Sequence, residues 1–86
     1  MTNLNRLEAL LRTISAEHGK EPSRSLMNLL EILHAGSQTE GDDHIIPMFK
    51  AILIELAMED EAEVDFRDFC LYFVNRINLE FKILLN

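Results

Sequence analysis

The sequence has few of the residues on which many folds and sites depend. Among its 86 residues there are one cysteine, two prolines and three glycines, and there is no tryptophan. A single cysteine excludes a disulfide framework and any metal site built from several cysteines. The shortage of glycine and proline leaves little room for the many turns that an all-β domain needs. These absences favour a helical fold.

Basic charge is also scarce. Fifteen acidic residues against eight lysines and arginines give a net charge of −7. The excess lies within residues 37–68, where Lys50 and Arg67 are the only bases. An acidic stripe repels nucleic acid and anionic lipid, so the partner it favours is a basic protein surface. A negative surface also promotes solubility, and that alternative stays open.

A long hydrophobic run is missing as well. The apolar segment Ala51–Ile54 is flanked by charged residues and is far shorter than the ~20 residues of a membrane span. The first apolar stretch is interrupted by three charged residues, so no secretory signal is visible. Together with the unpaired Cys70, this predicts a cytoplasmic location.

Apolar residues recur at helical spacing along most of the chain. Their periodicity predicts an all-α, compact four-helix domain with helices at about 3–18, 23–35, 45–58 and 65–84. We expect Thr2 or Asn3 to cap the first helix, Gly19 to end it and Gly36 to end the second, whose apolar stripe is widened by Ile32. Before the fourth helix, Asp65 and Asp68 are expected to form a capping box, with Val64 packing onto Phe69. The polar stretch 36–44 is interpreted as a hinge loop within a single helical domain covering residues 1–86.

The third and fourth predicted helices carry more apolar surface than one side of a helix accounts for. From Ile45 to Met58 the apolar residues point in every direction around the helix axis. Because large exposed apolar patches are rare on monomers, we expect a homodimer. The residues predicted to form its interface are Phe49, Leu53, Tyr72, Leu79 and Ile83.

No pattern of catalytic or cofactor-binding residues is legible. Glu31 and His34 have the spacing of half a di-iron site in a helix bundle, but no second Glu-x-x-His occurs. Cys70 lies among apolar residues without a base to activate it, which indicates a buried structural side chain. Glu55 is interpreted either as a surface glutamate or as one paired with an arginine. We therefore expect neither an enzyme nor a bound metal or cofactor.

One segment resembles a known family. Residues 63–69, Glu-Val-Asp-Phe-Arg-Asp-Phe, are similar to the end of an EF-hand loop that runs into its exiting helix, and the chain is similar in size to the small dimeric two-EF-hand proteins. The resemblance implies a calcium loop over residues 57–68. The first loop position, however, is Ala57, and Ala62 stands where the sharp turn needs glycine. Its closing ligand is Asp68 rather than glutamate.

These observations favour a small, acidic, non-catalytic protein-binding module, such as an inhibitor, immunity protein, antitoxin-like factor or adaptor, which occludes a partner's surface. The alternative is a degenerate EF-hand-like, calcium-responsive protein that uses residues 57–68. The residues predicted to contact a basic partner are Glu40, Asp42, Asp43, Glu59, Asp60, Glu61, Glu63 and Asp68.

Overall fold

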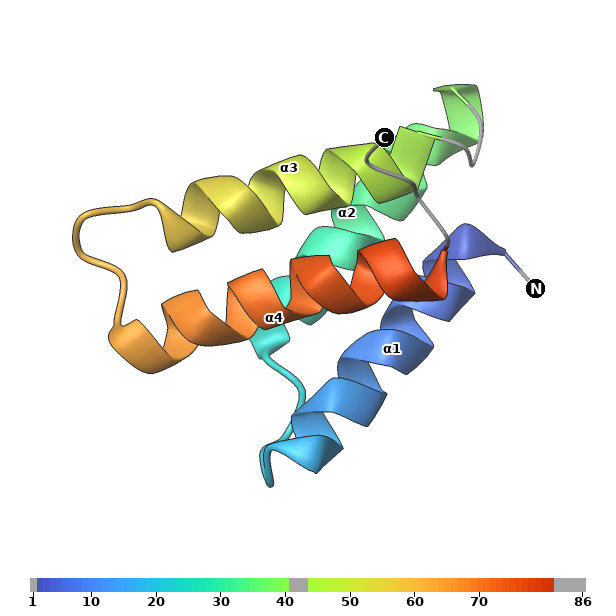
Figure 1. Ribbon diagram of the computed structural model, residues 1–86. Helices are drawn as coiled ribbons and strands as arrows, with labels where there is room; N and C mark the ends of the chain where they lie inside the picture. The colour runs from blue at the N-terminus through green and yellow to red at the C-terminus, as the bar shows by residue number, and fades with distance from the viewer. Residues whose placement is uncertain (1, 41–43, 82–86) are drawn as a thin grey trace. The chain divides into compact units, whose positions relative to one another are not determined.

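A computed structural model describes residues 2–40 and 44–81 of the chain. It contains four α-helices, α1 (Asn3–Glu17), α2 (Arg24–Glu40), α3 (Ile45–Ala57) and α4 (Val64–Glu80), as Figure 1 shows. The described residues include no strand, and the predicted all-α fold of four helices is confirmed. Within the same residues, no helix combines the length and apolar character that crossing a membrane requires. The chain divides into two compact units, Met1–Phe49 and Lys50–Asn86.

Both ends of α1 form as the sequence predicts. The Thr2 hydroxyl accepts a hydrogen bond from the backbone N–H of Asn5 at 3.1 Å, so it satisfies one of the free donors of the first turn. Gly19 follows the helix with φ of 68°, in the left-handed region that glycine adopts without a steric cost. The N–H of Lys20 then bonds to the carbonyl of Ser15 at 2.9 Å, which completes a Schellman-type end.

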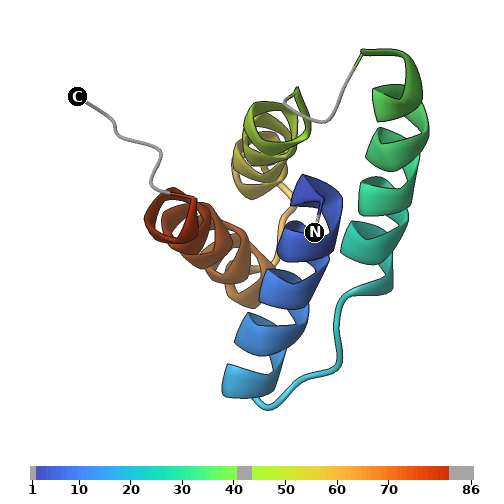
Figure 2. The same ribbon diagram turned by 90° about the vertical axis from the view of Figure 1, so that its right-hand side faces the viewer.

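The first unit is built on the packing of α1 against α2 (Figure 2). The leucines and isoleucines predicted for one face of α1 are buried from Leu7 to Ile14, while Leu4 is half-buried. Ile32, which we expected to widen the buried stripe of α2, is instead 66% exposed. The buried apolar side chains of this unit are Leu7, Leu10, Leu11, Ile14, Leu26, Leu30, Leu33, Ile45, Ile46 and Phe49.

The second helix is longer than the sequence indicated. We predicted its end at residue 35, but α2 continues to Glu40, so residues 36–40 of the expected hinge loop are helical. Glycine costs an exposed helix only about 1 kcal/mol, and serine and threonine cost less, so a polar stretch without proline does not stop a helix. Residues 41–43 of the predicted loop lie outside the described part of the chain.

The second unit consists of α3 from Lys50 onward, a connection and α4. Figure 1 shows the two helices running in opposite directions. The rings of Phe69 and Phe73 meet edge to face, with centroids 6.1 Å apart and planes at 73°, a favoured aromatic geometry. The buried apolar side chains of this unit are Leu53, Ala57, Cys70, Phe73 and Ile77.

Candidate functional site

The connection between α3 and α4, residues 58–63, is held by its own backbone. The N–H of Met58 bonds to the carbonyl of Ile54 at 3.0 Å, which carries the helical pattern one residue past α3. The N–H of Ala62 bonds to the carbonyl of Glu59 at 3.2 Å and closes a turn. The acidic side chains of this segment therefore project from a backbone with a defined conformation.

Arg67 ties this turn to α4. Its guanidinium Nη2 donates to the carbonyl oxygen of Glu59 at 3.2 Å, across eight residues of sequence. Its Nε is buried and has no hydrogen-bond partner within the described part of the chain. A positive charge thus lies at the base of the acidic turn and stabilises the backbone at Glu59 through a charge-assisted hydrogen bond.

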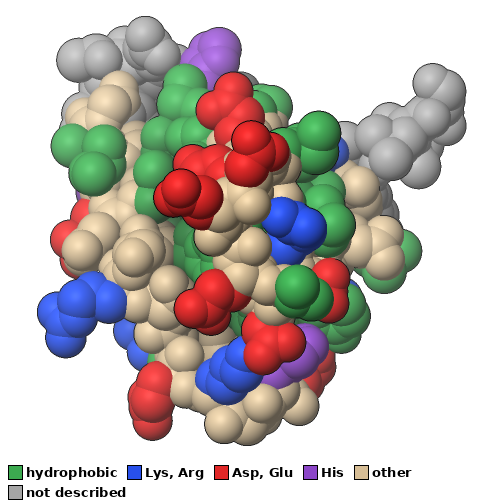
Figure 3. Space-filling view, turned by 90° about the vertical axis from the view of Figure 1, so that its left-hand side faces the viewer, with side chains coloured by type: hydrophobic (Ala, Val, Ile, Leu, Met, Phe, Trp, Pro, Cys, Tyr) green, Lys and Arg blue, Asp and Glu red, His purple; other side chains and the backbone are tan. Residues whose placement is uncertain are grey.

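Acidic side chains crowd this end of the second unit. Figure 3 shows the face that carries the α3–α4 connection, where acidic side chains gather with hydrophobic side chains exposed among them. Every acidic side chain from the end of α3 into the second turn of α4 is exposed. They belong to Glu55, Glu59, Asp60, Glu61, Glu63, Asp65 and Asp68.

Two exposed apolar side chains accompany these acids. Met58, the first residue of the connection, is 75% exposed, and Val64, which follows its last residue, is 65% exposed. Apolar side chains left in water at the border of a charged cluster are typical of the centre of a protein interface, where they supply affinity. We call the set made by Met58, Val64, Glu59, Asp60, Glu61, Glu63 and Asp68 the acidic patch.

The start of α4 differs from the predicted capping box. We expected Asp65 to cap the helix and Asp68 to reciprocate, but the N-cap is Glu63, whose side chain makes no capping hydrogen bond. Asp65 lies inside the first turn, where its negative charge stabilises the helix by interacting with the positive end of the helix dipole. Val64 was predicted to pack onto Phe69 outside the helix, and it is instead the first residue of α4. Glu63, Asp65 and Asp68 at this helix start are exposed to solvent.

The calcium alternative gains no support from this geometry. Ala57, at the first position of the aligned loop, is buried in the last turn of α3. Only residues 58–63 lie outside the helices, whereas the EF-hand loop has 12 positions. No group of three or more His, Cys, Asp or Glu side chains within residues 2–40 and 44–81 is arranged to hold a metal ion.

The residues predicted to contact a partner fall into two groups. Glu59, Asp60, Glu61, Glu63 and Asp68 are all exposed, on the α3–α4 connection and the first turns of α4. Glu40 is the last residue of α2, and nothing is described of its side chain. Asp42 and Asp43 lie outside the described residues. Sequence reasoning overlooked Met58 and Val64, although their position beside the acids was a usable signal.

The residues predicted for a dimer interface divide by exposure. Phe49 and Leu53 are both 0% exposed in the single chain, so neither lies on a surface that a second copy could contact. Leu79 is 69% exposed and Tyr72 is half-buried, on the face of α4 away from its buried residues. Ile83 lies outside the described residues. The predicted interface is reduced to the outer face of α4.

Tyr72 is braced by a charged neighbour. The Arg76 Nη1 donates to the Tyr72 hydroxyl at 2.9 Å, and the guanidinium carbon lies 5.7 Å from the centre of the tyrosine ring. A cation over an aromatic face is stabilising, so the two side chains hold one another in place. Tyrosine and arginine are enriched among residues that dominate interface affinity.

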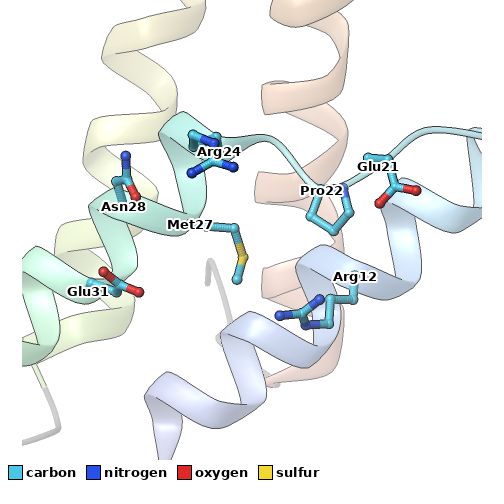
Figure 4. Close-up of a pocket in the computed structure, with 7 residues that line it drawn as sticks. All are labelled: Arg12, Glu21, Pro22, Arg24, Met27, Asn28 and Glu31. Atoms are coloured by element: carbon cyan, nitrogen blue, oxygen red, sulfur yellow. The ribbon is translucent and has the colours of Figure 1, made fainter.

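The first unit has an open groove between α1 and α2 with a volume of about 570 Å³ (Figure 4). Two arginines and two glutamates line it, so its rim carries charges of both signs in equal number. Arg12 is already paired with Glu8 at 3.2 Å. The residues that line the groove are Arg12, Glu21, Pro22, Arg24, Met27, Asn28 and Glu31.

Possible nucleophiles and metal ligands elsewhere serve the structure. Burial raises the pKa of the Cys70 thiol to about 11, so at neutral pH it is protonated and unreactive. His18 caps α1, where its Nδ1 lies 2.8 Å from the carbonyl oxygen of Ile14. Glu31 and His34 are both exposed, and Glu55 faces solvent as a surface glutamate.

Comparison with known proteins finds no matching family model, no matching curated protein and no matching solved structure. The chemistry of the acidic patch is therefore the basis on which a function is proposed.

Proposed function

We propose that this chain is a small, non-catalytic protein-binding module that occludes a basic surface of a partner protein, as an inhibitor, immunity protein, antitoxin-like factor or adaptor does. The observation that carries the proposal is the acidic patch, in which the exposed side chains of Met58 and Val64 border a run of exposed acids along the chain. A cytoplasmic location and a homodimer through the outer face of α4 belong to the same proposal.

The two parts of the acidic patch have different physical tasks. Burial of Met58 and Val64 against a partner contributes roughly 1.5–3 kcal/mol for each side chain that leaves water completely. The carboxylates attract a basic surface over about 10 Å at moderate salt, which raises the association rate and orients the encounter. Because surface charges act mainly on the rate, the acids should set how quickly the complex forms.

The acids near the end of α3 destabilise the C-terminus of that helix. A helix C-terminus is stabilised by basic residues, yet the last turn of α3, which is fully described, has none, and Glu55 and Glu59 lie at this end. The start of α4 favours acids nearby, so the repulsion concerns the end of α3 alone. A cationic partner would relieve this repulsion.

Reversing the charge of the acidic patch tests the proposal. We expect the triple variant Glu59→Lys, Asp60→Lys, Glu61→Lys to associate about ten-fold or more slowly than the natural chain at low salt, because the attraction becomes repulsion. The measurement is surface plasmon resonance against the partner captured from the native host and identified by mass spectrometry.

A matched variant controls for net charge. Glu17→Lys, Glu21→Lys, Glu31→Lys changes the same number of exposed acids in the first unit and should leave the association rate within about two-fold, because these acids lie outside the acidic patch. If both triple variants slow association equally, the acids act only through net charge and the acidic patch is not the contact surface.

A further inference from the structure

The outer face of α3 carries a row of apolar side chains, with the exposed Glu55 on the same side, where a surface helix is ordinarily polar throughout. Met48, Ala51, Ile54 and Met58 follow one another at spacings of three and four residues, so they lie on one side of the helix. Met48 is 43% exposed, Ile54 is 42% exposed and Met58 is 75% exposed, and Ala51 is exposed between them. At 1.5 Å per residue this row is about 15 Å long. We call these four residues the α3 row.

The exposed charges at the end of the α3 row are acidic, and Arg67 beneath them is only partly exposed. The row ends at Met58 and is followed at once by Glu59, Asp60 and Glu61, which are all exposed. The helix contributes a further negative charge at this end through its aligned peptide dipoles, and its last turn, described throughout, has no base. An occupant of the row therefore needs apolar side chains along its length and positive charge where it meets the acids.

A second copy of the chain does not meet this description well. Lys50 is the only base in α3, so a copy laid on the row would bring as much negative charge as positive to the acidic end. A partner helix with lysines or arginines beside an apolar stripe meets both requirements. Such a helix presents its apolar stripe at i, i+3, i+4 and i+7, which gives it an apolar side to lay along the row.

We propose that the α3 row seats an amphipathic, basic helix of the partner protein, with its cationic residues against Glu59, Asp60 and Glu61. This inference rests on the proposed function and names the partner's chemistry. Ala51 allows the backbones to approach closely, since interaxial distances of 8–10 Å depend on the side chains at the contact. Met48 and Met58, with their flexible thioether side chains, adapt to the partner on either side of it.

Binding of a designed peptide to the full-length chain tests the inference. The probe is a helical peptide of about 18 residues made of leucine and lysine, with leucine at i, i+3, i+4 and i+7. The control peptide has the same composition in an order that forms no apolar stripe. We expect saturable amide shifts at the α3 row and at residues 59–61, with the first peptide binding about ten-fold tighter than the control peptide.

A matched pair of substitutions distinguishes binding at the α3 row from nonspecific hydrophobic binding elsewhere on the chain. Ile54→Asn removes an apolar side chain from the α3 row without changing charge and should weaken binding about ten-fold. Ile32→Asn makes the same change on α2, where Ile32 is 66% exposed, and should leave binding within two-fold. Thermal unfolding of both variants checks that the chain remains folded.

Three results would overturn the inference. The first is equal affinity for the striped and the control peptide, and the second is equal loss of binding in both asparagine variants. Either leaves the proposed function intact if the charge-reversal variant still slows association with the natural partner. The third is a mass of twice 9.9 kDa that falls to 9.9 kDa in Ile54→Asn, because the α3 row would then be covered by a second copy.

Discussion

Burial lowers the reactivity of the Cys70 thiol. The side chain is 0% exposed, and loss of solvation raises the pKa of its thiol from 9.0 to about 11. Only the thiolate attacks a disulfide reagent, so we expect native protein at pH 8 to react at least ten-fold more slowly than protein unfolded in urea. Absorbance after addition of an aromatic disulfide reagent measures both rates. Equal rates in the two states would show that Cys70 is not buried.

The same thiol makes stability depend on pH in a defined direction. Its pKa is higher in the folded than in the unfolded chain, so the folded state retains the proton longer. Its contribution is therefore complete below about pH 9 and is lost as the pH rises toward 11. In a Cys70→Ala variant this part of the alkaline loss should disappear from the free energy of unfolding.

At the scale of the helices, replacing each of two glycines by alanine should change the free energy of unfolding in opposite directions, because one glycine is helical and the other has a positive φ. Gly36 lies inside α2, and among the described residues no atom outside the neighbouring helix backbone comes within 4 Å of an added Cβ. Gly36→Ala should therefore raise the free energy of unfolding by about 0.5–1 kcal/mol. Gly19 has φ of 68°, so Gly19→Ala should lower it by about 1 kcal/mol. Urea unfolding measures both. A destabilising Gly36→Ala would mean that α2 ends before Glu40.

Helix positions and helix ends were not equally predictable. Periodic leucines located α1, and local chemistry at Thr2 and Gly19 marked both of its ends. The end of α2 was missed because polarity was taken as a stop signal, while the backbone of residues 36–40 has no steric reason to leave the helix. Ile32 was misplaced because periodicity shows that a residue is apolar, but tertiary packing decides which flank of a stripe is covered.

At the scale of the whole molecule, association with a second copy is expected through the outer face of α4. Leu79 is 69% exposed, and Tyr72 is braced by Arg76. We expect light scattering to give twice 9.9 kDa at high concentration and the double variant Tyr72→Ser, Leu79→Ser to remain near 9.9 kDa. A mass of 9.9 kDa for the natural chain at every concentration, with the fold intact, contradicts the homodimer.

Exposure was easier to predict for acidic residues than for apolar ones. Charge runs are visible in a sequence and acids seldom become buried, so Glu59, Asp60, Glu61, Glu63 and Asp68 are exposed as expected. An all-round apolar helix, by contrast, has no pattern that identifies its covered side. Phe49 and Leu53 were therefore assigned to a dimer surface although they are buried, and the exposed Met58 was overlooked.

The bond from Arg67 to the carbonyl of Glu59 has a kinetic consequence. A turn that is already held in shape loses little conformational freedom when it is engaged, so less of the interaction energy is spent on ordering it. Complexes between preformed surfaces form at rates set by diffusion and orientation, and their affinities differ chiefly in lifetime. A substitution of an apolar residue in such a contact should therefore raise the dissociation rate of a complex far more than it lowers the association rate.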